Sequence, residues 1–161
     1  MSSEPGYLYG NNVAKVRVLR ELRETLSAPG AGSSVVLDVA CGGCDLWPFL
    51  LDEFPDVQFH GIDLNPHAIR KAQEVLPKHR DRLVVGRGED VDRIFRDAFD
   101  VVVSVGSLEH VKRRREFLRA VRDRLRPGGM FFLTYDSGHF LGTTIVERIK
   151  NVLSRVVAVG G

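Results

Sequence analysis

The sequence has few cysteines, little net charge and no long hydrophobic run. Two cysteines in 161 residues are too few for a disulfide framework. The 23 basic and 21 acidic side chains leave a formal charge of only +2, so no strong overall field favours nucleic acid or acidic lipid as a partner. No apolar run approaches the roughly 20 residues that span a bilayer, and no secretory leader follows Met1. We therefore predict a cytoplasmic protein without membrane association.

The length and composition indicate one globular domain. A chain of 161 residues leaves room for a single core, which excludes a two-domain enzyme. The hydrophobic fraction of 43% and the charged fraction of 27% are typical of a domain that folds without disulfides or metal. We predict no metal site.

Strand-like and helix-like segments alternate along the chain. Short runs rich in β-branched residues predict strands, and they stand at 35–40, 57–62, 83–85, 100–105 and 130–134. Apolar residues at helical spacing predict helices over 13–26 and 66–76. They also predict a helix that carries Phe117, Leu118, Val121 and Leu125 inward and ends at Pro127. This order predicts an α/β fold, an open parallel sheet with helices on both faces, whose ligands bind at the carboxyl ends of the strands.

The first predicted strand runs into a turn of small residues, with the sequence DVACGGCD over 38–45. Small residues allow a tight bend from strand to helix and let a ligand approach the backbone closely. By itself, such a turn is equally typical of a purely structural connection.

A carboxylate, Asp63, follows the second predicted strand. It stands 25 residues beyond Asp38, near the spacing of about 20 residues at which nucleoside-binding units carry the acid that accepts the ribose hydroxyls. Asp63 could instead cap the next helix, but Asn65 holds the better capping position. The third position of a dinucleotide fingerprint is Asp45, whose charge would repel a pyrophosphate. We therefore expect a nucleoside ligand without phosphates rather than NAD or FAD.

Five landmarks stand in a fixed order within residues 13–135. They are DVACGGC at 38–44, Asp63, FDVVVS at 99–104, LEHV at 108–111 and LRPGGM at 125–130. In this order they resemble the first motif, the ribose-binding acid, the fourth strand, the segment after it and the turn into the fifth strand of the class I S-adenosylmethionine-dependent methyltransferases. The resemblance implies a Rossmann-like fold and S-adenosyl-L-methionine as the cofactor.

The resemblance also implies a set of cofactor-binding residues. Asp38 would hold the first turn or meet the amino group of the cofactor, and Asp63 would bind the ribose hydroxyls. Arg87 stands where the family often has an acid, which moves the expected adenine contact to Gly88 and Glu89. The predicted cofactor-binding residues are Asp38, Ala40, Cys41, Gly42, Asp63, Leu64, Gly88, Glu89, Ser104, Val105 and Gly106.

Methyl transfer needs a base only if the acceptor loses a proton, because alignment of the reacting atoms supplies most of the acceleration. Candidates near the ends of the fourth and fifth strands, each of which can also have a purely structural role, are Glu109, His110, Tyr135, Asp136 and His139. We single out His110, Asp136 and Glu109 as the predicted catalytic residues. We predict transfer to oxygen or nitrogen of a small molecule.

Two alternatives remain open from the residues. Cys41 and Cys44 form a C-x-x-C at a strand-to-helix turn, where thioredoxin-like proteins carry a redox pair, although that fold does not explain Asp63. The basic run that contains Arg113, Arg114 and Arg115 could attract RNA, although such a run is more often a solvated helix face. In this second alternative the chain is a cofactor-binding but non-catalytic or RNA-associated module.

The C-terminal part is short for the resembling family, whose sheet has seven strands. A helix over 143–153 and a sixth strand over 155–159 use up the chain, so the seventh strand, which inserts beside the fifth, would be missing. The open edge would invite a partner or a second copy of the chain. We expect one domain over 1–161, with 1–12 as an N-terminal arm and 136–161 as an incomplete C-terminal part.

Overall fold

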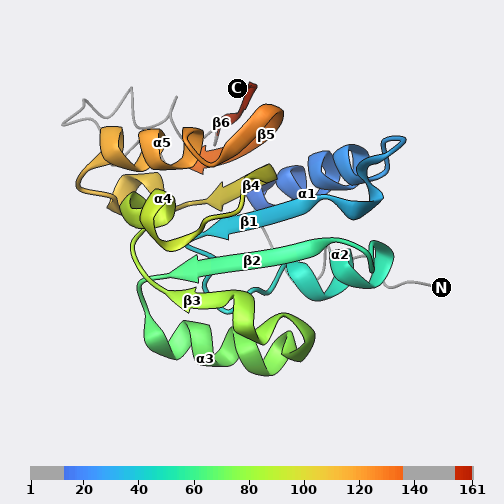
Figure 1. The fold of residues 1–161 in the computed structure, drawn as a ribbon, viewed down its shortest axis with the longest axis horizontal. Helices are drawn as coiled ribbons and strands as arrows, with labels where there is room; N and C mark the ends of the chain where they lie inside the picture. The colour runs from blue at the N-terminus through green and yellow to red at the C-terminus, as the bar shows by residue number, and fades with distance from the viewer. Residues whose placement is uncertain (1–12, 136–154, 161) are drawn as a thin grey trace.

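The computed structural model describes residues 13–135 and 155–160, and strands and helices alternate along them (Figure 1). The strands are β1 (Val35–Val39), β2 (Gln58–Asp63), β3 (Leu83–Val85), β4 (Phe99–Val105), β5 (Leu125–Tyr135) and β6 (Arg155–Gly160). The α-helices are α1 (Val13–Leu26), α2 (Trp47–Glu53), α3 (Pro66–Val75), α4 (Val91–Ile94) and α5 (Arg114–Arg122). Short 3₁₀ turns are η2 (Ala31–Ser33), η3 (Pro77–Arg82), η4 (Gly88–Asp90) and η5 (Leu108–His110).

The strands form one sheet in the order β3-β2-β1-β4-β5-β6. Strands β1 to β5 are parallel, which confirms the predicted α/β fold with an open parallel sheet. The chain first builds outward from β1 to β3 and then returns to place β4 on the other side of β1. Because the strand order reverses between β1 and β4, the loops at their carboxyl ends diverge and leave room for a ligand.

The last strand corrects the expectation for the C-terminal part. Strand β6 pairs antiparallel with β5, with Phe131 opposite Val159 and Thr134 opposite Val156. The strand predicted over 155–159 is confirmed as β6, and it takes the place beside β5 that the resembling family gives to its seventh strand. No seventh strand lies within the described residues, and the helix predicted over 143–153 falls outside them.

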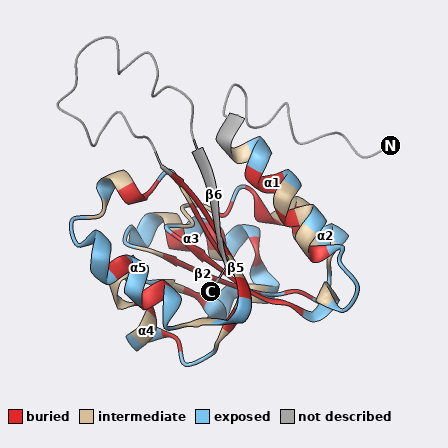
Figure 2. Cartoon of the chain, turned by 90° about the horizontal axis from the view of Figure 1, so that it is seen from above, coloured by how far each residue is buried: buried red, intermediate tan, exposed pale blue. Residues whose placement is uncertain are grey.

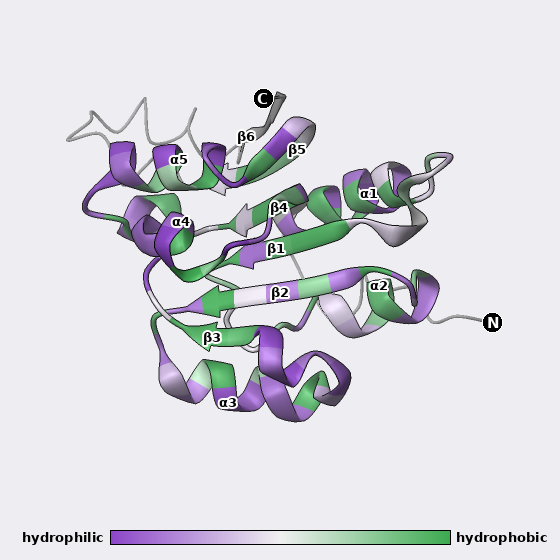
Figure 3. Cartoon of the chain, in the orientation of Figure 1, coloured by the Kyte–Doolittle hydropathy of each residue, from purple (hydrophilic) through white to green (hydrophobic). Residues whose placement is uncertain are grey.

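Helices cover both faces of the sheet and enclose two hydrophobic clusters (Figure 2). Helices α1, α2 and α3 pack on one face, where Leu22, Trp47 and Phe59 are among the most deeply buried side chains. Helices α4 and α5 cover the other face, where Phe117 of α5 and Phe99 of β4 belong to the second cluster. Figure 3 shows mostly hydrophobic residues in β1 and β3, whereas α3 and α5 carry many hydrophilic residues. Within the described part of the chain, no helix has the length and apolar character needed to cross a membrane.

Helix α5 is shorter than its apolar spacing predicts. It ends at Arg122, because Leu125 already pairs with Phe99 as the first residue of β5. Phe117 and Val121 are buried as expected, but Leu118 is 41% exposed, so its predicted inward position was wrong. Backbone pairing of β5 with β4 therefore ends the helix before the last turn that the apolar spacing predicts.

A polar clamp joins the beginnings of three strands at the edge opposite the diverging loops. The Asp100 Oδ2 atom accepts a hydrogen bond of 2.7 Å from the Val35 amide. Arg126 Nη1 donates to both carboxylate oxygens of Asp100 at 2.6 Å. Because Val35 begins β1, Asp100 lies in β4 and Arg126 lies in β5, this one carboxylate fixes the stagger of the central strands.

We predict that Asp100→Ala lowers the free energy of unfolding by about 1 to 3 kcal/mol, because it leaves the partly buried Val35 amide without an acceptor. Arg126→Ala keeps that acceptor and should cost less. Urea unfolding followed by circular dichroism measures both, with Asp56→Ala, an exposed acid outside the clamp, as the matched control. Equal loss in the Asp56 and Asp100 variants would contradict the clamp.

Candidate functional site

The turn after β1 has an unusual backbone. Ala40, Gly42 and Cys44 all have a left-handed conformation, with φ of 63°, 55° and 59°. Only glycine adopts this conformation freely, and a residue with a side chain costs about 1 to 2 kcal/mol there. The amides of Ala40 and Cys41 both donate to the Ile62 carbonyl, at 2.8 and 3.1 Å, and so hold the turn against β2.

Asp38 supports this turn from inside the protein. Its side chain is 4% exposed, and the Trp47 Nε1–H donates to its Oδ2 atom at 2.6 Å. Burial raises the pKa of Asp38 to about 7, and although the Trp47 hydrogen bond acts in the opposite direction, the nearby Asp63 charge raises it further. Trp47 was not among the predicted site residues. As the single tryptophan, nine residues after a strand-borne acid, it was the one available signal for this contact.

Asp63 joins the first turn to the start of α3. Its Oδ2 atom accepts from the Gly42 amide at 2.9 Å, and its Oδ1 atom accepts from the Asn65 amide at 2.8 Å. Asn65 Oδ1 in turn accepts from the His67 amide at 3.0 Å, which confirms Asn65 as the cap of α3. Each Asp63 oxygen keeps a second lone pair, so the carboxylate can still accept hydrogen bonds from a ligand hydroxyl.

The ends of β3 and β4 are held equally closely. A side chain at Gly88 would bring its Cβ within 2.6 Å of the Phe117 ring and 2.9 Å of Val39 Cγ1, so η4 presses directly on α5 and β1. After β4, the Gly106 amide donates to Thr134 Oγ1 at 2.9 Å. The Ser104 hydroxyl donates to the Val39 carbonyl at 2.9 Å and is hydrogen-bonded to the Ser107 hydroxyl. These contacts leave little freedom in the loops around the strand ends.

A cavity of about 530 Å³ lies between these loops. Seven of the predicted cofactor residues line it: Ala40, Asp63, Leu64, Gly88, Glu89, Val105 and Gly106. Four predicted residues do not line it: Asp38, Cys41, Gly42 and Ser104. Residues that line it without having been predicted are Val39, Gly86, Arg87, Ser107, Val111, Lys112 and Phe117.

The predicted catalytic residues fall into three situations. His110 lines the cavity. Glu109 does not, but its Oε1 atom lies 3.8 Å from the position of a Cβ on Gly106, and its buried Oε2 atom has no hydrogen-bond partner among the described residues. Asp136 and His139 lie outside the described residues, as does the side chain of Tyr135. His110 is therefore the predicted base that the structure brings to the cavity.

The geometry of the C-x-x-C does not favour redox chemistry. Cys44 is 1% exposed. The hydrogen bond with Cys44, burial and the neighbouring carboxylates all raise the pKa of the Cys41 thiol. A redox nucleophile needs a lowered pKa, because the thiolate is the reactive form. We therefore interpret the two cysteines as small side chains that fit the tight turn.

Part of the basic run is used within the fold. Arg113 Nε lies 4.0 Å from Glu89 Oε1, and Arg114 Nε donates to the Leu108 carbonyl at 3.3 Å. Both side chains therefore help to join α5 and η5 to the rest of the site. This internal use weakens the case for an RNA-binding surface made by Arg113, Arg114 and Arg115.

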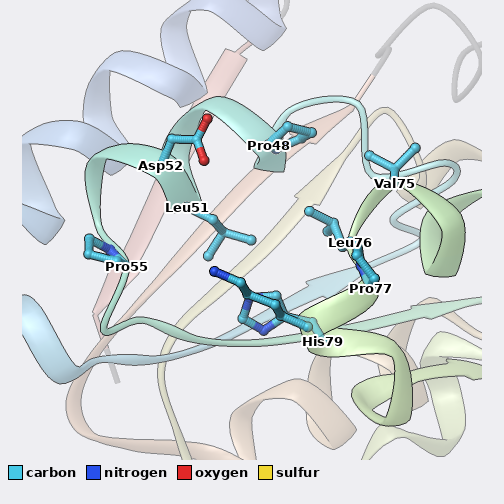
Figure 4. Close-up of a pocket in the computed structure, with 9 residues that line it drawn as sticks. Pro48, Leu51, Asp52, Pro55, Val75, Leu76, Pro77 and His79 are labelled. Carbon is cyan, nitrogen blue, oxygen red and sulfur yellow. The ribbon is translucent and has the colours of Figure 1, made fainter.

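A second cavity, of about 360 Å³, lies away from the strand ends. Figure 4 shows residues from α2, including Pro48 and Leu51, facing Val75, Pro77 and His79 from the end of α3 and from η3. Burial, with the Arg82 and Lys78 charges, lowers the pKa of His79. This cavity contains none of the predicted site residues.

The chain has detectable relatives among known proteins. The sequence model of a family described as "Methyltransferase domain" matches residues 37–131. The mitochondrial ubiquinone biosynthesis O-methyltransferase of Schizosaccharomyces pombe is 30% identical over 132 residues, which are 78% of this chain and 46% of that protein. The human thiol S-methyltransferase TMT1B is 31% identical over 106 residues, which are 63% of this chain and 42% of that protein. The chain thus spans less than half the length of these curated relatives.

A similar fold occurs among solved structures. CalS10, an amino pentose methyltransferase from Micromonospora echinaspora, superposes with a TM-score of 0.64 and 23% identity, over 82% of this chain and 55% of that one. That structure shares the fold, and the family match runs from within β1 to within β5 and includes the loops that form the cavity. The chain therefore belongs to the methyltransferase domain family.

Proposed function

We propose that this chain binds S-adenosyl-L-methionine and transfers its methyl group to oxygen or nitrogen of a small molecule. The observation that carries the proposal is Asp63 at the end of β2, fixed by two backbone amides and facing a cavity bounded by four strand ends. The names of the ubiquinone biosynthesis O-methyltransferase and of the amino pentose methyltransferase favour these acceptor atoms. The name of the thiol S-methyltransferase makes sulfur the next candidate.

The residues of the cavity fit this cofactor. Asp63 can accept both ribose hydroxyls, and Gly88 and Glu89, which line the cavity after β3, can offer backbone groups to an adenine edge. Val105 and Gly106 supply a small, partly apolar wall beyond β4. When bound, the cofactor supplies an electrophilic methyl group on a positively charged sulfur.

Asp38 and Ser104, which do not line the cavity, act as positioning residues. Asp38 holds the first turn through Trp47, and Ser104 holds β4 against β1 through the Val39 carbonyl. Neither lines the cavity, so each acts through the backbone of the loops that do. Rigid positioning of this kind supplies most of the acceleration in a displacement that requires three atoms in line.

His110 is the proton acceptor in this proposal. When the acceptor group receives the methyl group, the imidazole of His110 would take up the O–H or N–H proton that the acceptor loses. A histidine suits this step because a neutral imidazole has a ring nitrogen that accepts a proton. Glu109, beside Gly106, positions the same loop.

We predict that Asp63→Ala weakens binding of S-adenosylhomocysteine by at least about tenfold, because it removes charge-assisted hydrogen bonds to the ribose. Isothermal titration calorimetry measures the affinity, and thermal unfolding checks that the variant folds without the Gly42 and Asn65 contacts. Asp45→Ala is the matched control, since Asp45 is an exposed acid of the same turn that does not line the cavity. Unchanged affinity in a folded Asp63→Ala variant would refute the assignment.

A second prediction concerns pH and Asp38. Its pKa is raised from 3.8 to about 7 on folding, so its contribution to stability is full below about pH 4 and is lost as the pH rises through 7. Asp38→Asn removes this dependence. Between about pH 5 and pH 8, without cofactor, the variant should therefore gain about 2 kcal/mol relative to the parent chain in urea unfolding. Parallel pH profiles for the two proteins would contradict the buried, protonated Asp38.

A further inference from the structure

Among the described residues, the cavity between α2 and η3 shares no lining residue with the cavity at the strand ends. Its volume of about 360 Å³ lies in the range of about 300 to 1,000 Å³ that is usual for small-molecule sites. A proline has no backbone N–H, so three positions of its wall offer a ligand no backbone donor. The apolar residues of the wall are Pro48, Leu51, Pro55, Val75, Leu76 and Pro77 (Figure 4).

Backbone hydrogen bonds hold both sides of this cavity in place. On one side, the Phe54 amide donates to the Leu50 carbonyl at 2.8 Å and ends α2. On the other side, the Leu76 amide donates to the Ala72 carbonyl at 2.8 Å, and the His79 amide donates to the Leu76 carbonyl at 3.0 Å. The walls are therefore formed before a ligand arrives, which lowers the entropy cost of binding.

His79 lines the cavity with incomplete hydrogen bonding. Its side chain lies edge-on to the Phe59 ring, with centroids 6.0 Å apart, and its buried Nδ1 atom has no hydrogen-bond partner among the described residues. A proton on Nδ1 would be a buried donor without an acceptor, so the neutral tautomer with the proton on Nε2 is favoured. Burial, with the Arg82 and Lys78 charges, lowers the pKa of His79 and keeps the ring neutral. Because Nδ1 is buried, the Nε2–H is the donor that a ligand in the cavity can reach.

The two charged side chains that line the cavity have opposite signs. Asp52 belongs to α2, Lys78 belongs to η3, and both are exposed. Together they give the cavity no net charge, so neither an anion nor a cation is favoured over a neutral molecule. An apolar ligand body would meet the proline and leucine side chains, and one acceptor oxygen would meet His79.

We propose that this cavity binds a small, neutral, apolar molecule with one acceptor oxygen, of the class of the aromatic ketones, whose oxygen accepts a hydrogen bond from His79 Nε2. The site is separate from the cavity at the strand ends and does not rest on the proposed function.

Trp47 gives this site an internal reporter. The Phe59 ring lies between His79 and Trp47, with its centroid 4.2 Å from that of Trp47. Trp47 is also the neighbour of Pro48 in α2 and the single tryptophan of the chain. A ligand held by His79 therefore alters the surroundings of a side chain whose fluorescence can be read alone.

The test titrates the isotope-labelled chain with acetophenone, with ethylbenzene, which has a similar shape but no acceptor, and with benzoate, which is charged. NMR follows the amides of Leu51, Val75 and His79, and Trp47 fluorescence gives a second reading. The variant His79→Phe keeps a ring beside Phe59, removes the Nε2–H donor and removes a buried nitrogen without a partner, so it should fold as stably as the parent.

The matched control is His67→Phe, at an exposed histidine that does not line the cavity. A further variant, Val75→Phe, enlarges a side chain that is 40% exposed on the cavity wall and so fills the cavity from outside. It keeps the proposal testable if His79→Phe does not fold.

We expect acetophenone to shift the three amide signals and to bind about fivefold more tightly than ethylbenzene, because one neutral hydrogen bond separates the two ligands. Benzoate should bind more weakly than acetophenone. In His79→Phe the two neutral ligands should bind equally, whereas His67→Phe keeps the preference for acetophenone. Val75→Phe should weaken both neutral ligands by at least about tenfold.

Three results would overturn the inference. The first is equal binding of acetophenone and ethylbenzene by the parent chain, or binding of neither. The second is tighter binding of benzoate than of acetophenone, which would assign the cavity to anions. The third is a set of acetophenone shifts confined to Gly88 and Gly106, at the other cavity. If acetophenone shifts the Leu51 and His79 signals but S-adenosylhomocysteine does not bind the chain, the proposed function fails while this site stands.

Discussion

The candidate site depends on the way the backbone leaves β1. Three alternate residues, Ala40, Gly42 and Cys44, take a left-handed conformation, although only one of them is glycine. Such a turn persists only if its surroundings fix it. Here Trp47 holds Asp38 beneath the turn, and Asp63 holds the Gly42 amide beside it. The strained turn is therefore held in place by two carboxylates, those of Asp38 and Asp63.

This arrangement couples the architecture to the chemistry. The same Asp63 that fixes the first turn also fixes the start of α3 and lines the cavity, so the acid that we propose for ligand binding is part of the scaffold. Asp38 is a buried acid that does not line the cavity, and burial is the largest cause of its raised pKa. In the family motif, an acid is followed by small residues. The acid supports the turn from inside the core, and the small residues let a ligand approach the backbone from outside.

The sequence predicts the parallel strands well, because each is a short β-branched run flanked by turn residues, and the Asn65 cap is equally local. It does not predict contacts that depend on distant pairing. The direction of β6, the early end of α5 and the Trp47–Asp38 bond are all set by which segments meet in space. Likewise, a motif locates a loop but does not show which of its residues face the cavity. Cys41 and Ser104 do not line the cavity, whereas Arg87 and Lys112 do.

The central claim is that a nucleoside-bearing cofactor occupies the cavity at the strand ends. An NMR titration of the isotope-labelled chain with S-adenosylhomocysteine tests it most directly, because the backbone amides of Gly42, Gly88 and Gly106 report on the loops after β1, β3 and β4. The account predicts that all three signals shift together and saturate at one equivalent. Shifts confined to the groove between α2 and η3, around Val75 and His79, with these three signals unmoved, would contradict it.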